Sequence, residues 1–228
     1  MNNNRYIDIS DLFLNSSIRS IFSLKGFSLK KKINRYSLAK EVGFNPSYLV
    51  NPHQVHSSNI SICSKPGEIL ECDGVFTEKS NIVCSIQVAD CLPLFFAHRS
   101  ECVFGLVHAG WRGLVNNIIL ESGFLLRKHG FNLSEYEIVI GPSIQSCCFE
   151  VRDDIIDNFS KRYVKKTEHR KYKVDLQKFA FDKCLDIGFK SNNIIQMNEC
   201  TFCNSKKYYS FRKEGEKSGR MIGLIGTK

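Results

Sequence analysis

The segment VADCLPLFFAHRSECVFGLVHAGWRG, residues 88–113, gathers side chains that can do chemistry. Cys91 follows an aspartate, and His108 comes 17 positions later at the start of the run HAGWRG. A cysteine and a histidine can serve as a nucleophile with its base, as two ligands of one metal ion, or as buried core residues. The residue types alone leave all three interpretations open.

A third candidate ligand lies upstream in NPHQVHSSNI, which contains His53 and His56. Zinc in catalytic sites commonly takes three protein ligands from histidine, cysteine and carboxylate and keeps a fourth position open. His56, Cys91 and His108 would supply such a set. No spacing of the CxxC…HxxxH type supports it, and either histidine would also fit a hydrogen-bonded place in the core.

The run that follows His108 indicates an anion site. Gly110 and Gly113 permit tight turning and a close approach of ligand to backbone. The chain then enters a helix expected to start near Leu114, and free N–H groups at a helix start attract anions. Arg112, in the same turn, offers a planar fork for phosphate or carboxylate. Such a turn needs glycine in any case, but this combination of residue types favours a function.

Strands and helices that would position these side chains follow from the hydrophobic pattern. Short buried strands are expected at 82–88, 93–97 and 103–107, with the last two paired, and further strands at 137–142, 206–211 and 220–226. Helices are expected at 114–130, ending at Gly130, and at 175–188, with Asp175 as N-cap and Gly188 as its end. The order of elements predicts an α/β (α+β) fold, with mixed β-sheets forming a sandwich-like core flanked by helices, and not a doubly wound parallel sheet.

The 228 residues are expected to form a single domain, because no repeat, linker or change of composition divides them. No run approaches the roughly 18 apolar residues that span a bilayer. The N-terminus lacks the basic and apolar regions of a secretion signal. We therefore expect a cytoplasmic protein without a membrane partner.

Ten cysteines in a reducing compartment should remain free thiols, and we expect about seven to be packed in the core. Cys147 and Cys148 are adjacent and cannot readily bond to each other. The CTFC motif at 200–203 has no second CxxC to complete a four-cysteine metal site, so we interpret it as structural.

The net charge of +9 arises largely from two basic runs, residues 25–35 and 161–173. Such runs attract anionic small molecules or nucleic acid, or they form a solvated face. No RNP-like or other recognisable nucleic-acid motif accompanies them, so a nucleic-acid partner is not expected.

Seven motifs occur in a characteristic order: HQVHSS, CDGVFTE, VADCLPLFF, VHAGWRG, IGPSIQSCCFEV, CTFC and YYSFRKEG…SGRMIGLI. Together, over about residues 50–226, they closely resemble the bacterial laccase-domain (multicopper polyphenol oxidase-like) family. Members of that family are described as purine nucleoside phosphorylases with accessory adenosine deaminase activity. The resemblance implies that His56, Cys91 and His108 are metal ligands, for zinc in the first place and copper as the alternative.

The resemblance also implies a purine nucleoside and phosphate as substrates. Phosphate would be held by Gly110, Gly113 and the arginines of the matched motifs, Arg112, Arg212 and Arg220, with Arg35 as a further candidate. Arg112, Asp90 and Asp73 are the candidate catalytic residues, and the two aspartates would orient a ligand histidine, take a proton, or cap turns.

Two departures from the family pattern stand out. Ser57 replaces the glycine that usually follows the QVH motif. Residues 1–49 are shortened and divergent, and the loop that usually precedes the Asn34–Arg35 pair is missing.

Two other classes of function use the same residues. A metal-free cysteine hydrolase or deamidase would take Cys91 as nucleophile and His108 as base. A basic nucleic-acid-binding module would use the two basic runs. A multicopper oxidase is excluded, because six histidines cannot build its copper centres.

Overall fold

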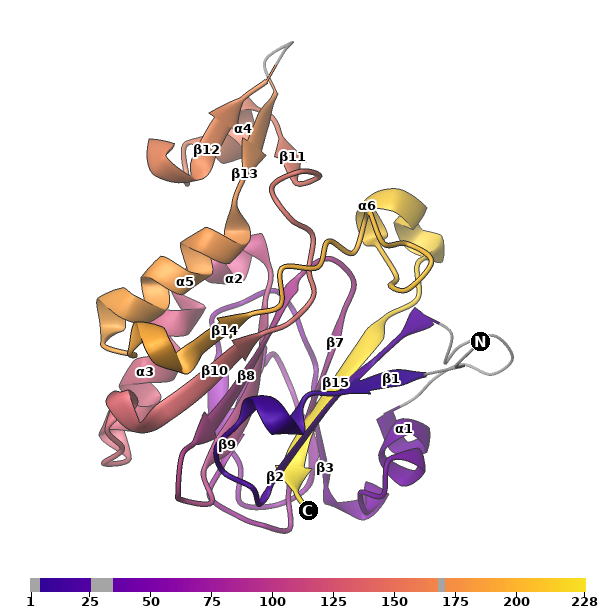
Figure 1. The fold of residues 1–228 in the computed structure, drawn as a ribbon, viewed down its shortest axis with the longest axis vertical. Coiled ribbons are helices and arrows are strands. Elements are labelled where there is room, and N and C mark those ends of the chain that lie inside the picture. The colour runs from indigo at the N-terminus through magenta and orange to yellow at the C-terminus, as the bar shows by residue number, and fades with distance from the viewer. Residues whose placement is uncertain (1–4, 26–34, 168–170) are drawn as a thin grey trace.

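The computed structural model describes residues 5–25, 35–167 and 171–228, and two six-stranded sheets form its centre (Figure 1). The first sheet has the order β1 (Tyr6–Asp8), β2 (Ile18–Ser23), β15 (Met221–Thr227), β7 (Val83–Val88), β3 (Leu49–Pro52) and β5 (Gly67–Ile69). The second has the order β14 (Ile194–Gln196), β10 (Tyr136–Ile140), β8 (Leu92–His98), β9 (Phe104–Ala109), β6 (Gly74–Thr77) and β4 (Ile60–Ile62). Both sheets combine parallel and antiparallel pairs, so the predicted mixed architecture is confirmed.

The two sheets pack face to face, and β8 shows how one strand serves two cores. Phe95 belongs to the cluster between the sheets, and its ring lies 6.5 Å from that of Phe22 in β2. Leu94 and Phe96, on the opposite face of the strand, join the cluster beneath the helices. This alternation with a period of two residues is that of a strand buried on both sides.

Helices cover the outer faces of the sandwich. On one side, α1 (Arg35–Glu41) packs on the first sheet through Leu38 and Ala39. On the other side, α3 (Ile118–Lys128) and α5 (Leu176–Ile187) cover the second sheet. The predicted sandwich-like core flanked by helices is therefore present. No helix within the described parts of the chain is both long and apolar enough to span a membrane.

The remaining strands and α-helices lie at one end of the sandwich (Figure 1). A small antiparallel sheet of β11 (Glu150–Val151), β13 (Tyr172–Val174) and β12 (Val164–Lys166) projects there together with α4 (Asp153–Ile156). Two short helices, α2 (Trp111–Val115) and α6 (Phe211–Glu214), complete the set. Of the two basic runs, residues 26–34 and 168–170 lie outside the described residues, and so does Asn34 of the Asn34–Arg35 pair.

Most of the predicted elements are confirmed. The strands expected at 93–97 and 103–107 are β8 and β9, and they pair in antiparallel register with Leu94 opposite Val107. The helix expected at 175–188 is α5, which begins after the Asp175 cap and ends at Gly188, whose φ of 109° lies in the left-handed region. The strands expected at 82–88, 137–142 and 220–226 are β7, β10 and β15.

The helix predicted over 114–130 is wrong in one respect, because it is two helices. Asn117 adopts a φ of 67° between α2 and α3, a left-handed conformation that asparagine tolerates better than most residues. The first helix also begins three residues earlier than expected, at Trp111. Arg112 therefore lies inside α2 and not in the turn that precedes it.

The strand predicted at 206–211 is absent, because local turns satisfy the backbone there. The N–H groups of Lys207 and Tyr208 both donate to the carbonyl oxygen of Asn204, at 2.8 and 3.0 Å. The Tyr208 ring is fully buried and its hydroxyl donates to Glu199. The aromatic residues on which the strand prediction depends therefore lie in a series of turns.

The N-cap of α5 gives a direct test of this helix. Asp175 accepts a hydrogen bond from the backbone N–H of Lys178 at 2.9 Å. Replacing Asp175 by alanine removes the acceptor and should lower the free energy of unfolding by about 1 kcal/mol. Asp175→Asn retains an acceptor oxygen and is the matched control. Equal chemical denaturation midpoints for the alanine variant and the parent would contradict the assignment.

Candidate active site

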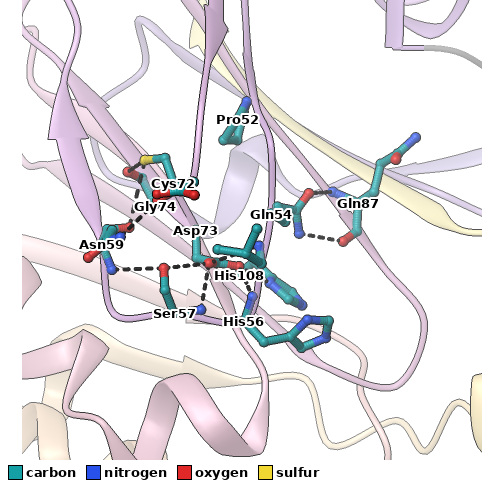
Figure 2. Close-up of polar contacts among 12 residues, drawn as sticks. Pro52, Gln54, His56, Ser57, Asn59, Cys72, Asp73, Gly74, Gln87 and His108 are labelled. Carbon is teal, nitrogen blue, oxygen red and sulfur yellow. Dashed lines mark hydrogen bonds and ion pairs between the residues drawn. The ribbon is translucent and has the colours of Figure 1, made fainter.

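Asp73 is the centre of a hydrogen-bond network at the end of the sandwich (Figure 2). Its side chain is fully buried, yet its carboxylate accepts the backbone N–H groups of Val55, His56 and Ser57 at 3.2, 3.0 and 2.7 Å. The hydroxyl of Ser57 adds a fourth bond of 2.7 Å, and His108 Nδ1 a fifth of 2.7 Å. Burial alone would raise the pKa of Asp73, but these partners outweigh it and lower that pKa to about 2.

His108 is held in one orientation by this network. It lies near the end of β9, 3% exposed, with its backbone N–H bonded to the Asp73 carbonyl at 2.7 Å. Because Nδ1 faces the Asp73 carboxylate, Nε2 remains as the nitrogen that can bind a ligand. A carboxylate behind a histidine in this way is the usual support for a metal-binding imidazole.

His56 and Cys91 complete a group of three donors. The donor atoms of His56, Cys91 and His108 all lie within 4.8 Å of one another, and the two imidazole rings are 4.8 Å apart at their centroids. The loop that carries His56 is strained, since the φ of this residue is 61°. Three bonds from that loop to Asp73 hold it in this conformation.

The charges of the group suit a metal ion. Burial tends to raise the pKa of Cys91, but His108 and His56 outweigh it and lower that pKa to about 6, which favours the thiolate. Burial tends to lower the pKa of His108, but Cys91 and Asp73 raise it to about 9. Once His108 has released its proton, two imidazoles and a thiolate form a donor set that zinc and copper both accept. The three residues therefore fit one metal ion with a coordination position left open.

Gly110 and Gly113 allow the helix α2 to approach this group. A Cβ atom on Gly110 would lie 3.0 Å from the Cys91 sulfur and 3.0 Å from His56 Cδ2. A Cβ atom on Gly113 would lie 2.9 Å from the carbonyl oxygen of Ser57. Both glycines thus provide space beside the donors, and neither is needed for a left-handed φ.

A cavity of about 850 Å³ opens beside the three donors. It is within the usual range of volumes for a site that binds a small organic molecule. Its walls bring together residues far apart in sequence, and they include the three donors and every arginine predicted for the site: Arg35, Arg112, Arg212 and Arg220.

Among the four predicted arginines, Arg112 has the most freedom to bind a ligand. Its guanidinium stacks over the Trp111 ring at 4.5 Å, and no hydrogen bond or ion pair joins it to another residue in the described part of the chain. Arg35, in contrast, donates to the Pro52 carbonyl and to Gln54 Oε1 at 3.3 and 3.1 Å. Arg112 therefore offers its full fork to the cavity, whereas Arg35 forms part of the wall.

Arg212 and Arg220 are anchored to backbone carbonyl groups. Arg212 Nη1 donates to the carbonyl oxygen of Glu150 at 2.8 Å, and Arg220 Nη1 donates to that of Ser218 at 2.8 Å. The Arg220 guanidinium also lies 5.6 Å from the centroid of the Phe211 ring. Each side chain is thus fixed through one nitrogen at the cavity.

Asp90 holds a neighbouring segment, and its side-chain hydrogen bonds go to that segment and not to a ligand histidine. Its carboxylate accepts the Thr201 hydroxyl at 2.6 Å and the backbone N–H of Arg212 at 2.7 Å. These are the contacts of a turn-capping residue, one of the roles considered for both aspartates. A role of Asp90 in proton transfer stays a prediction.

Several residues of the site lie within the sequence motifs but have no role predicted from the sequence. The side chain of Gln54 bonds to both the N–H and the carbonyl oxygen of Gln87 at 2.8 Å, which ties the His56 loop to β7. Phe149 and Phe211 add aromatic surface to the cavity. A glutamine or phenylalanine has no spacing that marks it, so only the fold reveals these roles.

The chain matches, over residues 29–228, the family described as multi-copper polyphenol oxidoreductase laccase. The chain belongs to this family. A purine nucleoside phosphorylase of Staphylococcus epidermidis is 31% identical over 207 residues, covering 84% of this chain and 77% of that protein. A purine nucleoside phosphorylase of Clostridium acetobutylicum is also 31% identical, covering 77% of this chain and 75% of that protein.

The fold of the family is the same in a solved structure. The hypothetical protein YfiH of Bacillus licheniformis has a TM-score of 0.89 and 22% identity to this chain, and the likeness covers 99% of this chain and 97% of that one. The family match begins at residue 29, and so it includes part of the N-terminal region that the sequence motifs do not reach.

The metal site can be tested by removing its ligands. Cys91→Ala and His108→Ala should each lose one equivalent of bound zinc, because two remaining donors hold the ion poorly. His53→Ala is the matched control, since His53 lines the cavity but does not belong to the donor group. Elemental analysis of the four purified proteins gives the answer, and full zinc content in both ligand variants would rule the site out.

The support that Asp73 gives to His108 leads to a second prediction. Asp73→Asn removes the charge behind the imidazole and should weaken zinc binding by about 10–100-fold. Ser57→Gly removes one hydrogen bond to that carboxylate and leaves the charge, so its effect should be clearly smaller. Competition with a chromophoric chelator measures both affinities. Equal affinities in Asp73→Asn and the parent would remove Asp73 from the metal site.

Proposed function

We propose that this protein is a zinc-dependent purine nucleoside phosphorylase. It would convert adenosine, inosine or S-methyl-5′-thioadenosine and phosphate into the free base and a ribose 1-phosphate. One observation carries the proposal, namely that the donor group of His56, Cys91 and His108 and the unpaired fork of Arg112 face the same cavity. The names of the relatives supply the reaction class.

The cavity has the features that a nucleoside and a phosphate need. Trp111, Phe149 and Phe211 contribute aromatic surface on which a purine can stack, while the arginines supply positive charge for phosphate. A volume of about 850 Å³ leaves room for both substrates together.

Phosphorolysis joins an oxygen of hydrogen phosphate to C1′ of the ribose and breaks the bond between C1′ and the purine nitrogen. The departing purine takes up the proton that the phosphate loses. Positioning of the two reactants and stabilisation of charge supply most of the rate for such a transfer. Arg112 would hold the phosphate as a bidentate partner, with Arg212 or Arg220 as a second contact.

Asp73 and Asp90 act in this proposal through other groups. Asp73 keeps the Nδ1 proton of His108 in place, and Asp90 fixes the backbone of Arg212 at the cavity. When bound, zinc supplies a Lewis acid at the cavity wall, which phosphorolysis and an accessory deamination of adenosine would both use.

A second candidate function uses the same side chains without a metal. Cys91, His108 and Asp73 form a chain of nucleophile, base and carboxylate, with His108 Nδ1 2.7 Å from Asp73 and the pKa of Cys91 lowered to about 6. This order is that of a cysteine hydrolase. Metal content separates the two, because a thiolate bound to zinc is not a free nucleophile.

One chromatographic assay tests the reaction. Adenosine and the zinc-loaded protein are incubated with and without phosphate, and we expect adenine and ribose 1-phosphate only when phosphate is present. Free ribose formed without phosphate would indicate a hydrolase, and inosine would indicate a deaminase. Untouched adenosine, with inosine and S-methyl-5′-thioadenosine equally unreacted, would contradict the phosphorylase and move the cysteine hydrolase to first place.

The role of Arg112 can be tested by keeping its charge and removing its fork. Arg112→Lys should weaken the use of phosphate by about 1.5–3 kcal/mol, the range for a charge-assisted hydrogen bond. Arg162→Lys is a matched control, because Arg162 also stacks on its neighbouring aromatic ring, Tyr163, at 4.7 Å but lies outside this cavity. An unchanged dependence of rate on phosphate in Arg112→Lys would exclude this arginine from phosphate binding.

A further inference from the structure

Four cysteines gather at a place separate from the three donors of the candidate active site. Cys147 and Cys148 follow β10, and Cys200 and Cys203 follow β14. Their four sulfur atoms all lie within 4.8 Å of one another. The sulfur of Cys203 is 3.7 Å from that of Cys147 and 3.3 Å from that of Cys148.

The backbone holds the two segments together independently of the sulfur atoms. β10 and β14 are parallel neighbours, so the chain leaves both strands at the same edge of the sheet. Ser143 and Cys200 continue this pairing as an isolated parallel bridge, and the N–H of Thr201 donates to the Ser143 carbonyl at 3.0 Å. The fold itself therefore brings the four cysteines together, without a metal ion.

We propose that Cys147, Cys148, Cys200 and Cys203 bind one structural zinc ion. Zinc bound by four thiolates is tetrahedral with bonds of about 2.3 Å, which places neighbouring sulfur atoms about 3.8 Å apart. The sulfur separations of 3.3 and 3.7 Å, within a limit of 4.8 Å for the whole group, agree with this spacing. One disulfide would use only two of the four sulfurs, whereas one zinc ion uses all four.

The surroundings suit a negatively charged centre. Four thiolates and one Zn²⁺ carry a net charge of −2, and each thiol releases its proton on binding. A cleft of about 390 Å³ beside Cys147 adds positive charge, since its lining includes three cations, Arg162, Lys165 and Lys173, and one carboxylate, Asp175.

The position of this thiolate site indicates what it does. Arg212 Nη1 donates to the carbonyl oxygens of Cys148 and Glu150, at 3.4 and 2.8 Å. Phe149, between these two residues, lines the active-site cavity. Zinc held by the four thiolates would therefore fix the wall of the cavity, and since all four ligands come from the protein no position remains open for a reaction.

Counting zinc in matched variants tests the proposal independently of enzyme activity. Parent, Cys203→Ser, Cys147→Ser, Cys102→Ser and Cys91→Ala are purified under reducing conditions, loaded with zinc, and freed of loosely bound metal by gel filtration. We expect two equivalents in the parent and in Cys102→Ser, whose cysteine lies outside both groups. We expect one equivalent fewer in Cys203→Ser and Cys147→Ser, the variants at the two exposed positions.

The same proteins loaded with cobalt(II) identify the ligands. Cys91→Ala should retain one cobalt ion with intense thiolate-to-cobalt absorption, and adding Cys203→Ser to it should abolish that absorption. Equal melting temperatures of metal-free parent and metal-free Cys203→Ser show that the serine variant folds.

Each outcome decides the proposal. The proposal is overturned if Cys203→Ser keeps its full zinc content or if Cys91→Ala binds no metal. It is also overturned if the parent, after purification under reducing conditions, contains a disulfide between Cys148 and Cys203. One zinc in the parent that is lost in Cys203→Ser but kept in Cys91→Ala would support the thiolate site and refute the metal site of the proposed phosphorylase.

Discussion

A single buried charge, the carboxylate of Asp73, determines the geometry of the candidate active site. A carboxylate that is fully removed from water is costly unless several donors surround it. Here the donors come from two places, the loop at 55–57 and the end of β9. To satisfy the charge, the chain must bring His56 and His108 together, so the solvation of one aspartate fixes the relation between two metal ligands.

The sandwich of two sheets provides the frame for this arrangement. The active-site cavity takes residues from β7, from the turn between β7 and β8, from the end of β9, from α2, and from the small sheet that projects beyond the body. Residues separated by more than a hundred positions, such as Asp90 and Arg212, are bonded directly. The site therefore depends on long-range strand pairing, and no single segment of the chain contains it.

The sequence predicts the elements with strong local signals and the residues with distinctive chemistry. The Asp175 cap and Gly188 mark α5 correctly, and the motifs alone single out His56, Cys91 and His108 as candidate ligands. The predictions fail where local bonding competes with composition. Aromatic residues at 206–211 favour a strand, but turns centred on Asn204 prevail, and the helix over 114–130 breaks at Asn117. Contacts across the fold are beyond such reasoning, as the role of Gln54 shows.

The cysteines show the same limit. Composition predicts about seven in the core, but only five of the ten are buried, and one of these, Cys200, belongs to the four-cysteine group. CTFC has no second CxxC, yet the adjacent pair Cys147 and Cys148 completes the group in space. Spacing within one segment cannot reveal a site whose halves follow two parallel strands.

The left-handed residue Asn117 has a consequence for how this protein tolerates change. Because the backbone at Asn117 is left-handed, α2 and α3 are two separate helices and not one continuous helix. A change in how α3 packs against α5 would alter the backbone at Asn117 and would leave the guanidinium of Arg112 in place. The position of Arg112 at the cavity is thereby separated from changes in the packing of the long helix.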